Sequence, residues 1–147
     1  MSKLETAYAG WRRAAEALDA ATCAAQGLSP VERRALVQVL DAPCASGELA
    51  RRVGLTRAGV TALIDRLETR GLVLRQPDPA DRRKIYIAPT EGARSLIDTA
   101  EEPLRTALAR LASEMTKDER KAVTRFLTAM AEATEIANQL AVQPHLE

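Results

Sequence analysis

More than any other stretch, residues 46–87 determine the fold; they read SGELARRVGLTRAGVTALIDRLETRGLVLRQPDPADRRKIYI. Apolar residues in the first half recur every three or four positions, the period of a helix packed on one side. Gly54 and Gly71 stand where the chain must turn, because glycine enters the left-handed region without steric cost. Ser46 and Thr56 are expected to cap two helices at their N-termini. Two helices joined by a tight turn predict a helix-turn-helix.

The second of these helices has an apolar face and an opposite face of short side chains flanked by cations. A recognition helix enters the major groove by its N-terminal turns, where short side chains allow close approach to base edges. The residues of the two helices that we expect to contact DNA are Ser46, Thr56, Arg57, Ala58, Thr61, Ala62 and Arg66. An ordinary solvent-exposed helix face has a similar composition, so the helix alone leaves both interpretations open.

A basic hairpin is predicted after the second helix. Residues 72–75 and 84–87 alternate between the two faces of a strand, and residues 77–81 between them are rich in proline and aspartate. Three cations follow this turn: Arg82, Arg83 and Lys84. Beside a recognition helix they form a wing that can reach phosphates or the minor groove, whereas an isolated charge run is usually only solvated.

This arrangement resembles the MarR family of bacterial transcriptional regulators, which are winged-helix homodimers. The segments that carry the resemblance are Leu28-Ser29, Glu48-Leu49-Ala50, VTALIDRLETRG at 60–71, Asp81-Arg82-Arg83, Ile85-Tyr86-Ile87 and Thr90-Glu91-Gly92-Ala93. The resemblance covers roughly residues 27–93 and implies that Asp65 pairs with Arg83, so that Asp65 and Asp81 position the wing. Pro89 stands where the family has leucine, and we expect strand pairing to end early there, because proline donates no hydrogen bond.

Helices are also predicted on both sides of this region. Residues 4–25 carry an apolar seam, which Gly27 ends, and the capping box from Ser29 to Glu32, with Pro30 at the first helical position, predicts a helix reaching Leu40. Residues 41–45 are expected to be a loop.

Two more helices are expected towards the C-terminus. Thr90 should start a long helix that Pro103 kinks or breaks, and a capping box at residues 116–119 should open a last helix whose apolar seam spans residues 123–140. We therefore predict a single MarR-like domain over residues 1–147. Its DNA-binding part is residues 28–93, and residues 1–27 and 94–147 are dimerisation helices.

The charge distribution and the composition limit the classes of function that the protein can have. The net charge of the chain is +1, but residues 28–95 carry a net charge of +4 and residues 96–147 one of −3, so the basic excess coincides with the helix-turn-helix and wing. No signal-peptide layout or long apolar run appears, which predicts a cytoplasmic protein without a membrane partner. The single histidine, His145, and the absence of a phosphate-binding loop argue against an enzyme; no cofactor is expected.

The two cysteines, Cys23 and Cys44, form no metal-binding or disulfide pattern, and no metal site is expected. The position of Cys23, near the end of the first helix, is similar to that of the oxidant-sensing cysteine of some family members. In the alanine-rich surroundings of Cys23, a structural role is favoured over a reactive one, since reactivity requires a lowered pKa and access to solvent.

The predicted fold is mainly α with a small β-hairpin wing, a winged helix-turn-helix with N- and C-terminal dimerisation helices. The predicted function is a sequence-specific regulator of transcription, a homodimeric repressor that binds a pseudo-palindromic operator in double-stranded DNA. A small-molecule effector, bound where the dimer helices meet the winged part, would release the DNA. The alternative is a winged-helix protein-interaction module that binds no DNA, which the modest charge excess would fit.

Overall fold

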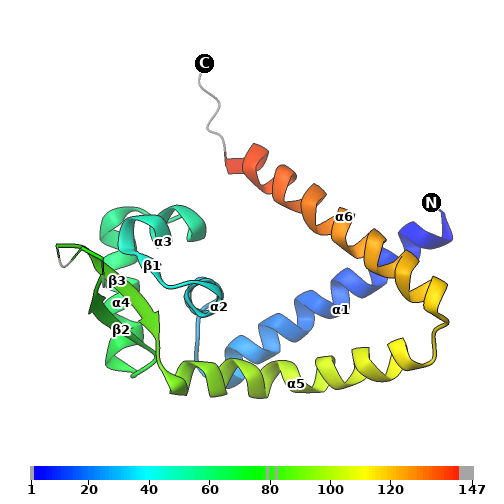
Figure 1. Cartoon of the computed structure of the whole chain (residues 1–147), viewed down its shortest axis with the longest axis horizontal. Helices are drawn as coiled ribbons and strands as arrows, with labels where there is room; N and C mark the ends of the chain where they lie inside the picture. Colours follow the sequence, from blue (N-terminus) through cyan, green and yellow to red (C-terminus); the bar gives the residue numbers. More distant parts are fainter. Residues whose placement is uncertain (1, 79, 82, 143–147) are drawn as a thin grey trace. The chain divides into compact units, whose positions relative to one another are not determined.

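The computed structural model describes residues 2–78, 80–81 and 83–142 (Figure 1). The helices are α1 (Lys3–Gln26), α2 (Pro30–Asp41), α3 (Ser46–Val53), α4 (Arg57–Thr69), α5 (Glu91–Ser113) and α6 (Lys117–Val142). The strands are β1 (Cys44–Ala45), β2 (Val73–Pro77) and β3 (Ile85–Pro89). The chain forms two compact units, one up to Ala100 and one from Glu101. The mainly helical fold with a small sheet is confirmed.

The core of the first unit holds the helix-turn-helix together. One core cluster contains fully buried leucines from three helices: Leu36 of α2, Leu49 of α3 and Leu63 of α4. The sheet contributes Ile87 of β3 to the same cluster. Burying each such side chain stabilises the fold by about 1.5–3 kcal/mol. The apolar period of the sequence is therefore the feature that places α3 against α4.

The turn and caps around α4 follow the expectation. Gly54 ends α3 at φ +72°, and the Thr56 side chain accepts a hydrogen bond from the Gly59 N–H at 3.1 Å. At the other end Gly71 has φ +68°, and the Leu72 N–H donates to the Leu67 carbonyl at 2.9 Å, the bond that closes a Schellman motif. The helix-turn-helix prediction is confirmed at both ends of the recognition helix α4.

Ser46 does not cap α3. It is the first helical residue, and the N-cap position belongs to Ala45, which makes no side-chain cap bond. Ala45 is the end of strand β1, so its backbone is already extended (φ −68°, ψ 152°), as an N-cap requires. The expected cap is therefore wrong by one residue, because the strand that precedes the helix was not foreseen.

The sheet has three strands instead of the expected two. Its order is β1-β3-β2, with antiparallel pairs Cys44↔Ile87 and Ala45↔Tyr86 on one side of β3 and five pairs with β2 on the other. Residues 41–45 are thus not all loop. Burial of Cys44 in the core offsets the entropy lost when this short strand becomes ordered. The same burial raises the pKa of the Cys44 thiol.

Pairing does not end early at Pro89, contrary to expectation. Pro89 pairs with Val73, and the next donor along the chain, the Thr90 N–H, bonds the Leu72 carbonyl at 3.1 Å. Because the proline is the last residue of β3, the ladder loses no bond beyond it.

The flanking helices begin and end largely as predicted. Gly27 ends α1 in the left-handed region, and the Ser29–Glu32 capping box opens α2. Thr116 and Glu119 form the second box. Of the two outcomes expected at Pro103, the break is wrong, because α5 continues through this residue as one helix, and the kink stays a prediction. Pro103 is exposed, so water can hydrate the carbonyl that loses its intrahelical donor.

Each unit leaves large apolar side chains on its surface. In the first unit Trp11 and Leu18 of α1 are 60% and 43% exposed, and in the second Leu108 of α5 and Phe126 of α6 are 59% and 41% exposed. Across the residues that the structure describes, none of the helices combines the length and apolar character needed to cross a bilayer.

Candidate nucleic-acid interface

The outer face of α4 presents the predicted reading residues together. Arg57, Ala58, Thr61 and Ala62 lie in its first two turns and are all exposed, while the apolar residues of the same helix are buried. The Thr61 hydroxyl donates to the Arg57 carbonyl at 2.9 Å, so it can accept a bond from a base and offer its methyl group. Within the described residues the Arg57 guanidinium makes no hydrogen bond or ion pair.

Arg66, also predicted to contact DNA, has a protein partner. Its Nε donates to Oε1 of Glu32 at 2.9 Å, while the other oxygen of Glu32 accepts the Ser29 N–H at 2.8 Å. Partial burial disfavours the charged form of Glu32, but the bonds from Arg66 and Ser29 outweigh it and hold its pKa below the ordinary value. This pair ties the last turn of α4 to the start of α2.

The wing tip is shaped by its aspartates. Asp81 accepts the Arg83 N–H on its side chain at 3.1 Å and the Lys84 N–H on its carbonyl at 2.9 Å. The Asp78 N–H then donates to the Lys84 carbonyl at 2.9 Å, which closes the neck of the loop. The side chains of Arg83 and Lys84 are exposed. Arg82, like His145, lies outside the described residues.

Asp78 has a structural role in the wing that the sequence pattern did not indicate. It is 8% exposed, accepts the Ala80 N–H at 2.7 Å, and its negative charge raises the pKa of Tyr86 on β3. The proline- and aspartate-rich composition signalled a turn but not which aspartate would be enclosed by it.

Asp65 contacts the wing through a different residue from the one expected. Its Oδ1 accepts from Nη2 of Arg75 at 2.6 Å, and Arg75 also pairs with Glu68. The hydrogen bond to Asp65 is the largest of the contributions that raise the pKa of Arg75. The Asp65–Arg83 pair is therefore not formed. Arg75 lies on β2, which packs beside α4, whereas Arg83 follows the turn at the wing tip.

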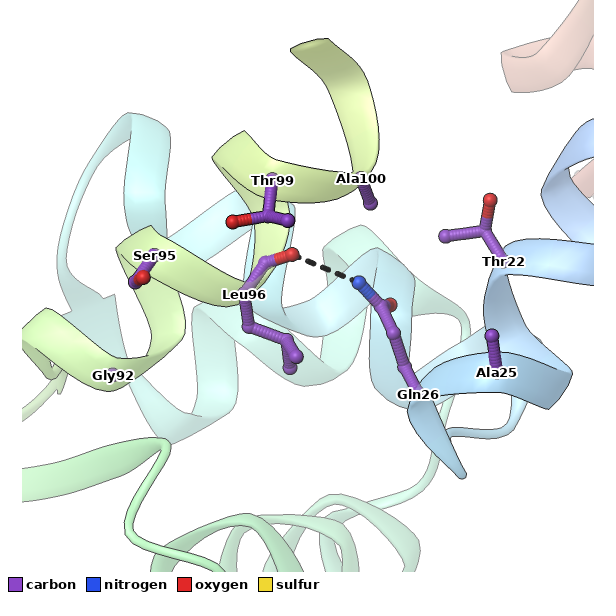
Figure 2. Close-up of a pocket in the computed structure, with 8 residues that line it drawn as sticks. All are labelled: Thr22, Ala25, Gln26, Gly92, Ser95, Leu96, Thr99 and Ala100. Carbon is purple, nitrogen blue, oxygen red and sulfur yellow. Dashed lines mark hydrogen bonds between the residues drawn. The ribbon is translucent and has the colours of Figure 1, made fainter. Parts of the chain in front are cut away.

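A cavity of about 560 Å³ lies between the end of α1 and the start of α5, both in the first unit. Figure 2 shows the residues that line it. It is lined by Thr22, Ala25, Gln26, Gly92, Ser95, Leu96, Thr99 and Ala100. Across it, Nε2 of Gln26 donates to the Leu96 carbonyl at 3.0 Å. The lining is apolar with hydroxyl groups and one amide, and it contains no charged side chain. Small residues carry no pattern that would have revealed it in the sequence.

The described residues contain no cluster of three or more potential metal ligands. Cys23 is 7% exposed beside Asp19 and Arg33, and Cys44 is 1% exposed in the core.

Comparison with known proteins decides the family. A family model described as the MarR family matches residues 26–84. The HTH-type transcriptional regulator YcgE of Bacillus subtilis (strain 168) is 34% identical over 116 residues, which are 78% of this chain and 75% of that protein. The chain belongs to the MarR family. The homoprotocatechuate degradative operon repressor of Escherichia coli, another relative, is 30% identical over 80 residues, 54% of each chain.

A solved structure is similar to this chain over most of its length. The crystal structure of RV1404 from Mycobacterium tuberculosis superposes with a TM-score of 0.69 at 27% identity and covers 92% of this chain and 96% of its own. As a MarR-family member the chain is a DNA-binding transcriptional regulator. This assignment favours DNA binding over the protein-interaction module, and the relatives are regulators, not enzymes.

Proposed function

We propose that this MarR-family regulator is a cytoplasmic, homodimeric repressor that binds a pseudo-palindromic operator in double-stranded DNA and releases it when a small molecule binds. The observation that carries the DNA part is the exposed face of α4, where the Arg57 guanidinium makes no hydrogen bond or ion pair with any other described residue and stands among short side chains. The E. coli relative is a repressor by name, which favours repression as the direction of control.

In this proposal the residues divide into readers and anchors. Arg57 and Thr61 meet base edges, and Ala58 and Ala62 allow α4 to approach them closely. Residues at helix starts, in the last turn of α4 and on the wing neutralise or hydrogen-bond phosphates. These are Ser46, Thr56, Arg66, Arg82, Arg83 and Lys84. Asp65 and Asp81 position the wing.

Dimerisation rests on the apolar surfaces that each unit leaves exposed. Trp11 and Leu18 on α1, and Phe126 on α6, are side chains that a monomer would keep wet. We assign residues 1–27 and 94–147 to the dimerisation helices and residues 28–93 to the DNA-binding part. A two-fold dimer would then select half-sites about 10 base pairs apart, one turn of the duplex.

The cavity between α1 and α5 is the proposed effector site. Its volume of about 560 Å³ is within the range of small-molecule pockets. Because the lining offers hydroxyl groups and an amide but no charge, it fits an uncharged molecule with an apolar body and a polar group.

Selection of random duplexes by the purified full-length protein, followed by sequencing, tests the proposal. The expected result is a pseudo-palindrome whose binding weakens steeply with salt. Absence of salt-dependent binding to every duplex would contradict the proposal. Enrichment of single half-sites only would contradict the two-fold dimer while leaving DNA binding intact.

A further inference from the structure

The C-terminal end of the recognition helix is bonded directly to the C-terminal end of α1. Arg70, which follows α4, donates from Nη1 to the Gly27 carbonyl and from Nη2 to the Gln26 carbonyl, both at 2.7 Å. Carbonyls at a helix C-terminus carry the negative end of the helix dipole, so a guanidinium that bonds two of them makes a directed, charge-assisted contact.

These bonds are not needed to end α1. The Gly27 N–H already donates to the Ala24 carbonyl at 3.2 Å, and the Leu28 N–H to the Cys23 carbonyl at 3.0 Å, which completes the cap. Both Arg70 bonds are also exposed, so water could replace them without leaving a buried polar group unpaired. What Arg70 adds is a link between α1 and α4.

The same end of α1 forms a wall of the cavity. Gln26, whose carbonyl accepts from Arg70, sends its side chain to the Leu96 carbonyl of α5 (Figure 2). Its Oε1 is buried without a hydrogen-bond partner among the described residues. On the α5 side, the Thr90 hydroxyl donates to the Gly71 carbonyl, next to Arg70, at 2.7 Å. Hydrogen bonds thus join the end of α1 to α5, the end of α1 to the residue after α4, and the residue before α5 to the turn after α4.

We infer that Arg70 is a positioning residue through which the cavity-facing end of α1 sets the placement of the recognition helix. This inference rests on the proposed function, in which the cavity holds an effector. An occupant that competes for the Gln26 amide frees α1 from Leu96. The two carbonyls then move with α1, and Arg70 draws the end of α4 with them. In a dimer, a small shift of each recognition helix changes their spacing on DNA.

The test uses full-length protein with variants in place of an unidentified ligand. Arg70→Met removes the link, Arg70→Lys keeps the charge at the α1 terminus, and Arg94→Met removes the same charge from an exposed position on α5. Dissociation constants are measured on the selected duplex and on a scrambled one, with thermal unfolding of each variant. We expect Arg70→Met to weaken selected-site binding at least about fivefold more than Arg94→Met does, the low end of measured site couplings. Arg70→Lys should recover part of the loss.

The discriminating measurement is a double-variant cycle. Gln26→Ala removes the bond to Leu96, and we expect it to weaken selected-site binding about two- to tenfold, the range for one neutral hydrogen bond. In the Arg70→Met background the same change should have almost no effect, since the link that transmits it is gone. Fully additive losses, or equal losses on both duplexes, would overturn the inference. Failure of the parent protein to bind a selected duplex would instead refute the proposed function.

Discussion

Arg75 of β2 donates from Nη2 to Oδ1 of Asp65 in α4 at 2.6 Å, so the first strand of the wing is bonded to the exposed side of the recognition helix. Glu68, one turn further along α4, pairs with the same guanidinium. A carboxylate near phosphates is unfavourable unless a cation neutralises it. Arg75 pairs with both carboxylates, which offsets one of their two negative charges, and it bonds the wing to α4 at the same time.

Asp65→Ala should therefore weaken binding even though it removes a negative charge. We expect the affinity for the selected duplex to fall about two- to fivefold, the range for the loss of an exposed ion pair, here one that orients the wing. Fluorescence anisotropy titration measures it, and Asp41→Ala, at the exposed end of α2, is the control for charge alone. Tighter binding to selected and random duplexes alike would show that the pair has no positioning role.

Arg57→Ala should separate base reading from phosphate contact. We expect a cost of about 1–3 kcal/mol on the selected duplex and much less on a scrambled one, because a bidentate contact to a base is sequence-dependent. Lys84→Ala is the matched comparison: it should weaken both duplexes similarly and reduce the salt slope by about one. Equal losses on the two duplexes for Arg57→Ala would remove Arg57 from the reading surface.

The Glu32–Arg66 pair should make stability depend on pH in acid. Because the folded protein lowers the pKa of Glu32 from 4.5, its ionised form stabilises the fold above that value, and this contribution is lost as the pH falls through the lowered pKa. Glu32→Gln should cost about 0.5–1 kcal/mol near neutral pH, since Arg66 is partly screened by solvent. In denaturant titrations the difference between parent and variant should vanish in acid; a difference independent of pH would assign it to packing.

Trp11 should report the dimer interface. It is the only tryptophan of the chain and is 60% exposed on α1, so an isolated chain should show a solvent-like emission maximum. We expect a blue-shifted maximum at micromolar concentration, with a single dimeric species in sedimentation. Trp11→Glu should shift the species towards monomer, because burying a carboxylate in an apolar interface is costly. A parent protein that sediments as a monomer at this concentration would contradict the dimer.

Cys23→Ser should leave DNA binding and its response to peroxide unchanged. Cys23 is only 7% exposed, and oxidation requires an accessible thiolate. The measurement is an electrophoretic shift of the selected duplex with and without peroxide, for parent and variant. Peroxide-induced release that the parent shows and the variant lacks would make Cys23 a sensor.

The parts of the fold that could be predicted depend on residues close in sequence. The apolar period of α4, the left-handed Gly54 and Gly71, and the capping boxes are each properties of a few consecutive residues, and all are confirmed. Short-range geometry is enough to recognise a helix-turn-helix.

The features that could not be predicted depend on contacts between residues that are far apart in the sequence. Strand β1 exists because Cys44 pairs with β3, more than forty residues later. Arg75, Arg70 and Gln26 gained their roles from neighbours across the fold, and the cavity is lined by small residues without a pattern. Pro103 does not break α5, because propensity is a local preference that the rest of the helix can override.

Only Leu72 separates the left-handed Gly71 from strand β2, and Arg75 at the third position of that strand already returns to α4. Anyone who redirects this regulator to a new operator therefore faces a practical limit. A foreign recognition helix grafted alone would arrive without acids to meet Arg75 and would leave a cation unmatched at the DNA surface. The segment to exchange is therefore residues 56–77, which contains both the recognition helix and the first wing strand. Sequence specificity in this fold is changed by exchanging the two elements together.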